Sequence, residues 1–200
     1  SNFILSEMES NQTSFESALK TAQELGLAES NPNLDINGKD AAQKASILAA
    51  LAFRVPFDFS FVSFDGIQDI ELEDLKYAKE LGYSIKHIAY GELENNIACV
   101  SALPSLVSNK NLLSQVGKEM NALEIFSEGV GSTVYYGPGA GSEPTASAVM
   151  ADLVDIAKGG WALDINSNIT NKLEVSDRKK AAHYYRLQVR DEPGVIAKIS

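Results

Sequence analysis

Three carboxylates and two lysines lie within the sixteen residues from 29 to 44, on both sides of a predicted turn. Four of these side chains are candidates for chemistry: Glu29, Asp35, Asp40 and Lys44. Pro32 and Gly38 interrupt the stretch, which indicates a loop that leads into a helix. Asp40 and Lys44 are four residues apart, so they share one face of that helix. Loops held by rigid elements often carry binding and catalytic groups, so this segment is our first candidate for a site.

These residue types suit two kinds of chemistry. Carboxylates such as Glu29 and Asp35 can compensate the charge of an ammonium group that leaves water. Lys44 can relay a proton if burial lowers its pKa more than the nearby carboxylates raise it. Otherwise it stays charged and can stabilise a developing negative charge. The alternatives are a solvated loop and an exposed Asp40–Lys44 pair, which would stabilise a helix by only roughly 0.2–0.5 kcal/mol.

The helix that positions Asp40 and Lys44 is expected to run from about residue 40 to residue 53. A carboxylate at its start meets free backbone amides and the positive end of the helix dipole. Apolar residues recur along one face, at Ala41, Ala45, Leu48 and Leu51. Upstream, Thr13-Ser14-Phe15-Glu16 has the spacing of a capping box and predicts another helix, which ends at Gly26.

Further along the chain, short apolar segments separated by glycine-containing turns predict strands. We expect strands at 59–63, 84–90, 96–103, 122–127 and 132–136, and helices at 72–81 and 144–158. Helices come first and strands then predominate. This order favours an α+β fold with a mixed, largely antiparallel sheet that helices cover on one face.

The segment Gly137-Pro138-Gly139-Ala140-Gly141 follows a predicted strand and precedes a predicted helix. Glycines let a backbone approach a ligand closely, and the start of the next helix offers free amides. A dinucleotide-binding G-x-G-x-x-G fingerprint would need glycine where the chain has Ser142. This glycine loop is therefore either a tight turn or a backbone surface against a ligand that another segment mainly holds.

Composition bears on partners and location. The net charge of −10 argues against a nucleic-acid partner, because a protein that neutralises phosphates needs a basic face. No run reaches the roughly 18 apolar residues of a membrane span, so we expect no membrane partner. The single cysteine, Cys99, lies in an apolar run and fits a cytoplasmic protein without disulfides. His87 and His183 have no metal-ligand spacing, so we expect structural histidines and no metal site.

The C-terminal part changes character after about residue 163. Residues 164–182 are largely polar and charged, and we expect a linker there. Residues 183–190 alternate like a strand, an Asp-Glu-Pro-Gly turn follows, and a helix is expected to begin at Val195. One strand and half a helix cannot bury a core, so residues 183–200 are expected to begin a domain that this chain leaves incomplete.

Several of these segments together resemble the homoserine dehydrogenase family. Segment 26–44 is similar to the family signature of a glutamate, an aspartate and then Gly-x-Asp-x-x-x-Lys, here Gly38 to Lys44. Segment 136–149 resembles the family's glycine loop and the helix that follows it. Residues 184–200 look like the opening strand and Pro-Gly turn of an ACT regulatory domain, and residues 1–5 resemble the start of the family's catalytic domain.

The resemblance implies an activity and assigns residues to it. The reaction is the NAD(P)-dependent interconversion of L-homoserine and L-aspartate 4-semialdehyde, a step toward threonine, methionine and isoleucine. By similarity, Lys44 is the proton donor and acceptor at the substrate oxygen. Glu29 and Asp40 would bind and orient homoserine through its amine and hydroxyl, and Asp35 would support the amine site.

The resemblance also implies a cofactor, NADP or NAD, which Gly139 and Gly141 would contact. The family's main cofactor site is an N-terminal nucleotide-binding domain that we expect to be absent here, so we expect the chain alone to be inactive. The expected division is a catalytic domain at 1–163, a linker at 164–182 and an incomplete ACT-like segment at 183–200. A homodimer is implied as well.

Two other functions stay open from the sequence. One is a non-catalytic regulatory module that binds an amino acid, which depends on the ACT-like segment. The other is the substrate domain of a different amino-acid dehydrogenase.

Overall fold

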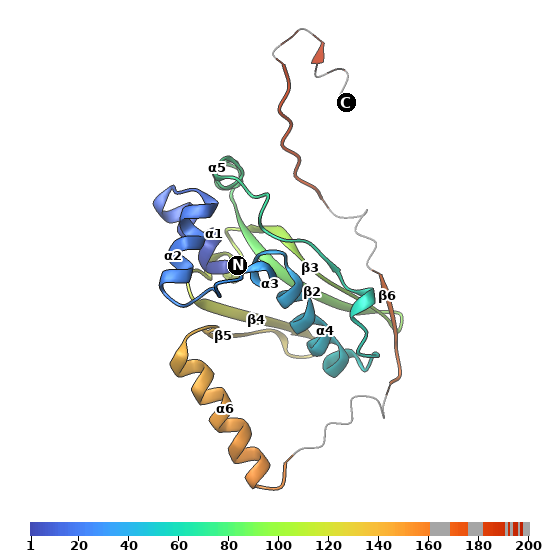
Figure 1. Cartoon of the computed structure of the whole chain (residues 1–200). Helices are drawn as coiled ribbons and strands as arrows, with labels where there is room; N and C mark the ends of the chain where they lie inside the picture. Colours follow the sequence, from blue (N-terminus) through green and yellow to red (C-terminus); the bar gives the residue numbers. More distant parts are fainter. Residues whose placement is uncertain (161–168, 176–181, 191, 193, 196, 198–200) are drawn as a thin grey trace.

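The computed structural model describes residues 1–160, 169–175, 182–190, 192, 194, 195 and 197. These residues form an α+β fold with a mixed sheet, which confirms the predicted fold class at that level (Figure 1). Parts of the expected linker (164–168 and 176–181) and of the ACT-like segment (191, 193, 196 and 198–200) lie outside the described residues.

The N-terminal helices form one layer of the core. They are α1 (Asn2–Asn11), α2 (Phe15–Glu24) and, later in the chain, α5 (Leu72–Glu80). Helix α2 ends before Gly26, as predicted, but its N-cap is Ser14, whose hydroxyl accepts a hydrogen bond from the Ser17 amide. Helix α1 was not predicted, although it buries Ile4, Leu5 and Met8 completely. The apolar side chains of this layer pack against Ile67 and the start of the sheet.

The main sheet is built on a long hairpin of β2 (Tyr83–Glu94) and β3 (Ile97–Ser108). The turn is Asn95–Asn96, both with positive φ, so the strands run further than predicted. Asparagine tolerates this left-handed conformation, and the polar run before it stays paired. On the other edge of β3, β1 (Ser63–Phe64) and β6 (Lys172–Val175) both pair in parallel.

Two sequence predictions near this sheet need correction. The strand expected at 59–63 is wrong: residues Phe59–Phe61 form a 3-10 turn, η1, and only β1 after it pairs with β3. Asp58 caps that turn through a hydrogen bond from the Ser60 amide, which diverts the backbone from strand geometry. Strand β6 lies within the expected linker and was not predicted.

Helix α4 (Lys39–Phe53) crosses the sheet and occupies almost the whole predicted range. Its buried face is nearly all alanine and serine: Ala42, Ala45, Ser46, Ala49 and Ala50. Small residues of β3, among them Ala98 and Ala102, face it and let the backbones come close. The predicted apolar stripe is therefore wrong in part, because Leu48 and Leu51 are 45% and 42% exposed.

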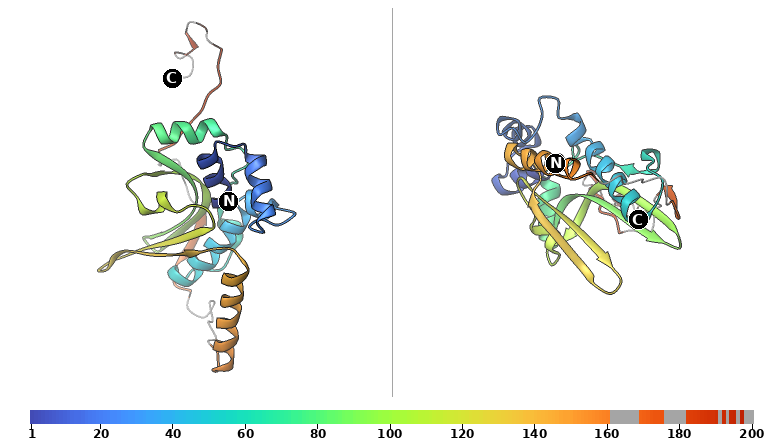
Figure 2. Two further views of the ribbon diagram at one scale, coloured as in Figure 1. Left: turned by 90° about the vertical axis from the view of Figure 1, so that its left-hand side faces the viewer. Right: turned by 90° about the horizontal axis from the view of Figure 1, so that it is seen from below.

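A second sheet consists of the antiparallel strands β4 (Met120–Ser127) and β5 (Gly131–Pro138), close to the predicted ranges. A 3-10 turn, η2 (Leu112–Gln115), precedes it. Helix α6 (Ser142–Ala157) follows β5 and buries no residue against the rest of the described chain. Figures 1 and 2 show α6 extending away from the sheets and the other helices.

Residues 182–190 belong to no helix or strand, so the strand predicted there is not observed. The segment is nonetheless attached to the domain at the start of α5. The Arg186 guanidinium pairs with Asp74 at 2.8 Å and with Glu71 at 2.6 Å, and the Tyr184 hydroxyl donates to Asp74 at 3.1 Å. Since the Asp74 side chain is only 8% exposed, these contacts attach residues 182–190 to a buried carboxylate.

None of the helices in the described part of the chain has both the length and the apolar character needed to span a membrane.

Candidate functional site

The candidate site begins at the turn between the short helix α3 (Asn33–Ile36) and α4. Gly38 is the N-cap of α4, with φ at +83°. A β-carbon on Gly38 would overlap the backbone carbonyl of Asp65 and press on the His87 ring. Only glycine combines this conformation with so close an approach. The close contact fixes where α4 begins, and with it the positions of Asp40 and Lys44.

Asp40 and Lys44 form a direct ion pair, with Lys44 Nζ 2.7 Å from Asp40 Oδ2. Their side chains are 40% and 65% exposed. The structure therefore brings together the pair that the sequence placed on one helix face. Both groups lie in the first two turns of α4 and remain accessible to a ligand.

Asp35 lies beside this pair, at the same end of α4. All three side chains lie near the backbone nitrogen of Ser1. The Ser1 hydroxyl donates to the Asp35 carbonyl, which holds the end of α3 in place. Three of the four predicted side chains thus lie in one region, at the start of α4.

Glu29 lies on the exposed loop after α2, and its carbonyl accepts a hydrogen bond from Gln23 Nε2 at 3.0 Å. No hydrogen bond or ion pair joins its carboxylate to Asp35, Asp40 or Lys44 in the described part of the chain. The structure therefore groups the other three residues and leaves Glu29 apart from their contacts.

The glycine loop is connected to the same region through β4. The Gly139 amide donates to the Glu119 carbonyl at 2.9 Å, and Asn2 Nδ2 donates to the next carbonyl, that of Met120, also at 2.9 Å. Asn2 follows Ser1, whose hydroxyl donates to the Asp35 carbonyl. This chain of contacts ties the loop to the end of the molecule that carries Asp35 and Asp40.

The local geometry of the loop requires glycine at two positions. Gly139 packs so tightly on the Asn121 side chain that any β-carbon would collide with it. Gly141 has φ +122° and ψ 158°, a conformation essentially reserved for glycine, and it caps α6 without a side-chain bond to the first amides. Asn121 therefore covers Gly139, and the donors that the loop leaves for a ligand are the first amides of α6.

His87 holds the backbone against which the start of α4 packs. Its Nε2 donates to the Asp65 carbonyl at 2.9 Å, the same carbonyl that packs on Gly38. Burial lowers the pKa of His87, and the Asp65 hydrogen bond opposes that shift. This supporting role was not apparent from the sequence, where only the alternating strand around residue 87 was visible. No group of side chains in the described residues could hold a metal ion.

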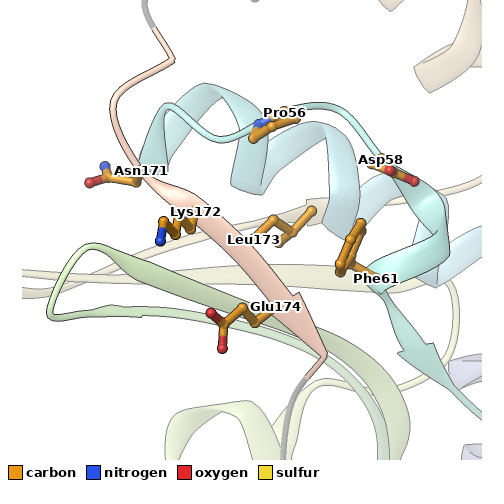
Figure 3. Close-up of a pocket in the computed structure, with 7 residues that line it drawn as sticks. All are labelled: Pro56, Asp58, Phe61, Asn171, Lys172, Leu173 and Glu174. Atoms are coloured by element: carbon orange, nitrogen blue, oxygen red, sulfur yellow. The ribbon is translucent and has the colours of Figure 1, made fainter.

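The clearest pockets of the described structure lie away from these residues. One of about 290 Å³ lies between β6 and the chain after α4. Figure 3 shows Leu173 and Phe61 pointing into it, with Lys172 and Glu174 on the rim. A second, of about 420 Å³, is lined by residues of α1, α5 and β2. Neither pocket is lined by Asp35, Asp40 or Lys44.

The described residues thus form an α+β domain that carries two carboxylates, Asp35 and Asp40, and Lys44 at the start of α4. The homoserine dehydrogenase family profile matches residues 1–154. The chain therefore belongs to the homoserine dehydrogenase family.

Individual relatives agree with this. The chain is 44% identical to a homoserine dehydrogenase of Helicobacter pylori in an alignment of 202 positions that covers all of this chain and 48% of that protein. It is 39% identical to that of Bacillus subtilis, covering all of this chain and 47% of the relative. A crystal structure of a homoserine dehydrogenase from Thiobacillus denitrificans superposes with a TM-score of 0.77 at 38% identity, over 99% of this chain and 48% of the other. The chain thus spans about half the length of these relatives.

Proposed function

We propose that this chain is the substrate-binding and catalytic part of an enzyme that interconverts L-homoserine and L-aspartate 4-semialdehyde with NAD(P). The observation that carries the proposal is the group formed by Asp35, Asp40 and Lys44 at the start of α4. Family membership supports the reaction, and the geometry supports the roles of the residues.

Substrate binding is assigned to the carboxylates. An amino-acid substrate brings an ammonium group that needs negative partners when it leaves water. Asp35 at the end of α3 and Asp40 at the start of α4 are the carboxylates that would supply these partners. Glu29 would complete this set from the loop after α2, which would have to approach the substrate.

Lys44 is assigned to the substrate oxygen. Paired with Asp40 at 2.7 Å, its ammonium can still donate two further hydrogen bonds, because an ammonium has three donors. Donation to the carbonyl oxygen stabilises the negative charge that develops there and supplies the proton of the alcohol. Asp40 keeps the ammonium directed toward the substrate.

The glycine loop is assigned to the cofactor. When bound, NAD(P) supplies or accepts the hydride at the carbon that carries this oxygen. Gly139 and Gly141 would let the backbone lie against the cofactor, and the free amides at the start of α6 would offer donors. The main binding surface would come from outside these 200 residues, so we expect the isolated chain to be inactive.

A homodimer formed through the β4–β5 hairpin accompanies this proposal. Phe126 is 81% exposed, Tyr135 is 61% and Tyr136 is 60%, so the hairpin presents large apolar side chains on its surface. Such patches commonly mark protein interfaces. Sedimentation of the full-length protein tests this, and a monomer at micromolar concentration would contradict it.

The function is tested by replacing Lys44 with Met in the full-length protein. We expect kcat for aspartate-semialdehyde reduction to fall roughly 10²–10⁴-fold, the usual contribution of a positioned acid or base. The matched control is Lys20→Met, which removes the lysine of another exposed i,i+4 pair, Lys20–Glu24. Activity retained in Lys44→Met, or lost equally in both variants, would overturn the proposal.

A further inference from the structure

A second feature of the molecule lies outside this site: the charged side chain of Lys86 is almost completely buried. Lys86 is on β2 and is only 7% exposed. Its ammonium donates to the Val116 carbonyl at 2.6 Å. Among the described residues, no carboxylate forms an ion pair with it. Lysines are almost never buried without a partner of opposite charge, so this position calls for an explanation.

Lys86 lines the pocket of about 420 Å³ between α1, α5, β2 and the turn after η2. The lining is polar and includes three lysines and one glutamate; its other side chains are uncharged. It consists of Ser6, Glu9, Ser10, Lys79, Ser84, Lys86, Asn109, Ser114, Gln115, Gly117 and Lys118. The charged lining groups therefore carry a net charge of +2 in a chain whose overall charge is −10.

Hydrogen bonds hold the walls of the pocket in place before any ligand arrives. The Ser84 hydroxyl donates to Asn109 at 3.0 Å, and the Lys118 amide donates to the Ser6 hydroxyl at 3.1 Å. Lys86 itself is fixed by Val116, and its ammonium has two more protons to donate. The pocket is therefore preorganised and rich in donors.

We propose that this pocket binds a small oxyanion, a carboxylate or phosphate group, with Lys86 as the buried counter-charge. Such an anion offsets the desolvation of the ammonium and accepts its free protons. Lys79 and Lys118 add attraction at the rim, and the Asn109 amide nitrogen can donate to a further oxygen, because the Asn109 oxygen already accepts from Ser84. Burial lowers the pKa of Lys86, while Glu9 opposes that shift from the same pocket.

Glu9 provides a control variant with the opposite expected effect on anion affinity. Its negative charge stabilises the Lys86 ammonium from a distance and repels an incoming anion, so Glu9 and the anion compete for Lys86. Removing it should strengthen anion binding, whereas a merely structural role of Lys86 predicts no such gain. Neither Lys86 nor Glu9 belongs to the group at the start of α4, so the anion-binding proposal and the proposed dehydrogenase function can be refuted independently.

The test titrates the full-length protein with inorganic phosphate and, separately, with malonate, against chloride at matched ionic strength. Amide NMR shifts of residues 84–86 and 114–118 locate the site, and the tighter of the two probes identifies phosphate or carboxylate as the preferred group. We expect saturable binding, weakened at least about tenfold in Lys86→Met, as for a lost charge-assisted hydrogen bond. Glu9→Gln should tighten it several-fold, and Lys20→Met should leave it unchanged.

Two results would overturn the proposal: no saturable binding of either probe beyond chloride, or equal affinity in a folded Lys86→Met. If that variant does not fold, the exposed Lys118→Gln and Glu9→Gln decide. Weakening in the first and tightening in the second support the site. No change in either contradicts it.

Discussion

Substituting Gly38 with alanine tests whether the close contact at the start of α4 positions the site. Gly38 has φ +83° and its β-carbon would overlap the Asp65 carbonyl, which also accepts a hydrogen bond from His87. The carbonyl cannot move without breaking that hydrogen bond and disturbing β1. We therefore expect α4 to shift at its first turn, where Asp40 lies.

The size of the effect follows from two contributions. An L-residue in the left-handed region costs roughly 1–2 kcal/mol, and forcing an extra carbon into a packed site costs roughly 1–3 kcal/mol. Gly38→Ala should therefore lower the free energy of unfolding by about 2–5 kcal/mol. Gly26→Ala is the matched control, since Gly26 has φ +69° and no atom lies within 4 Å of the position that its β-carbon would take. It should lose only about 1–2 kcal/mol.

Urea denaturation of the two variants measures the difference, and activity of the full-length protein measures the consequence for the site. A displacement of about 1 Å can lower a catalytic rate roughly 100-fold, so Gly38→Ala should lose far more activity than Gly26→Ala. Equal destabilisation of both variants would show that the backbone conformation alone matters. The contact with Asp65 would then not be what positions α4.

Two further predictions concern His87 and the C-terminal segment. Burial lowers the pKa of His87 below 6.5, so the folded state favours the neutral imidazole ring. The contribution of neutral His87 to stability is complete above about pH 6.5 and is lost as the pH falls through the lowered pKa. His87→Gln should flatten the fall in the free energy of unfolding between about pH 7 and about pH 5, and an unchanged slope in urea titrations would refute this. Arg186→Met should speed amide hydrogen exchange across 182–190, because it removes the ion pairs with α5. Arg190→Met, whose partner lies on the exposed surface at 4.0 Å, should not, and equal exchange in both variants would contradict the anchoring role.

Local sequence patterns were sufficient to predict the helices and strands whose periodicity and boundary residues lie within one segment of the chain. Helix α4, the β4–β5 hairpin and helix α6 appear close to their predicted ranges. In each case the periodicity and the glycine or proline at the boundary act locally. Strand β6 differs, because four residues become a strand only where β3 offers its free edge. No local pattern carries that information.

The orientation of α4 shows why composition along a helix does not decide its buried face. Leucine is more apolar than alanine, so the stripe containing Leu48 and Leu51 was the expected core. The sheet opposite presents Ala98 and Ala102, and against such a flat surface alanines give the closer packing. Leu48 and Leu51 are left partly exposed on the opposite side of the helix.

The candidate site depends most on this kind of nonlocal information. The pairs Asp40–Lys44 and Lys20–Glu24 are both exposed and both four residues apart on a helix. Spacing alone gives no reason to assign chemistry to one and not to the other. What distinguishes Asp40–Lys44 is its surroundings: Asp35 lies at the same end of α4, and Gly38 fixes the helix start against Asp65. A charged pair becomes a candidate site when the fold adds a second carboxylate and removes the freedom of the helix to move.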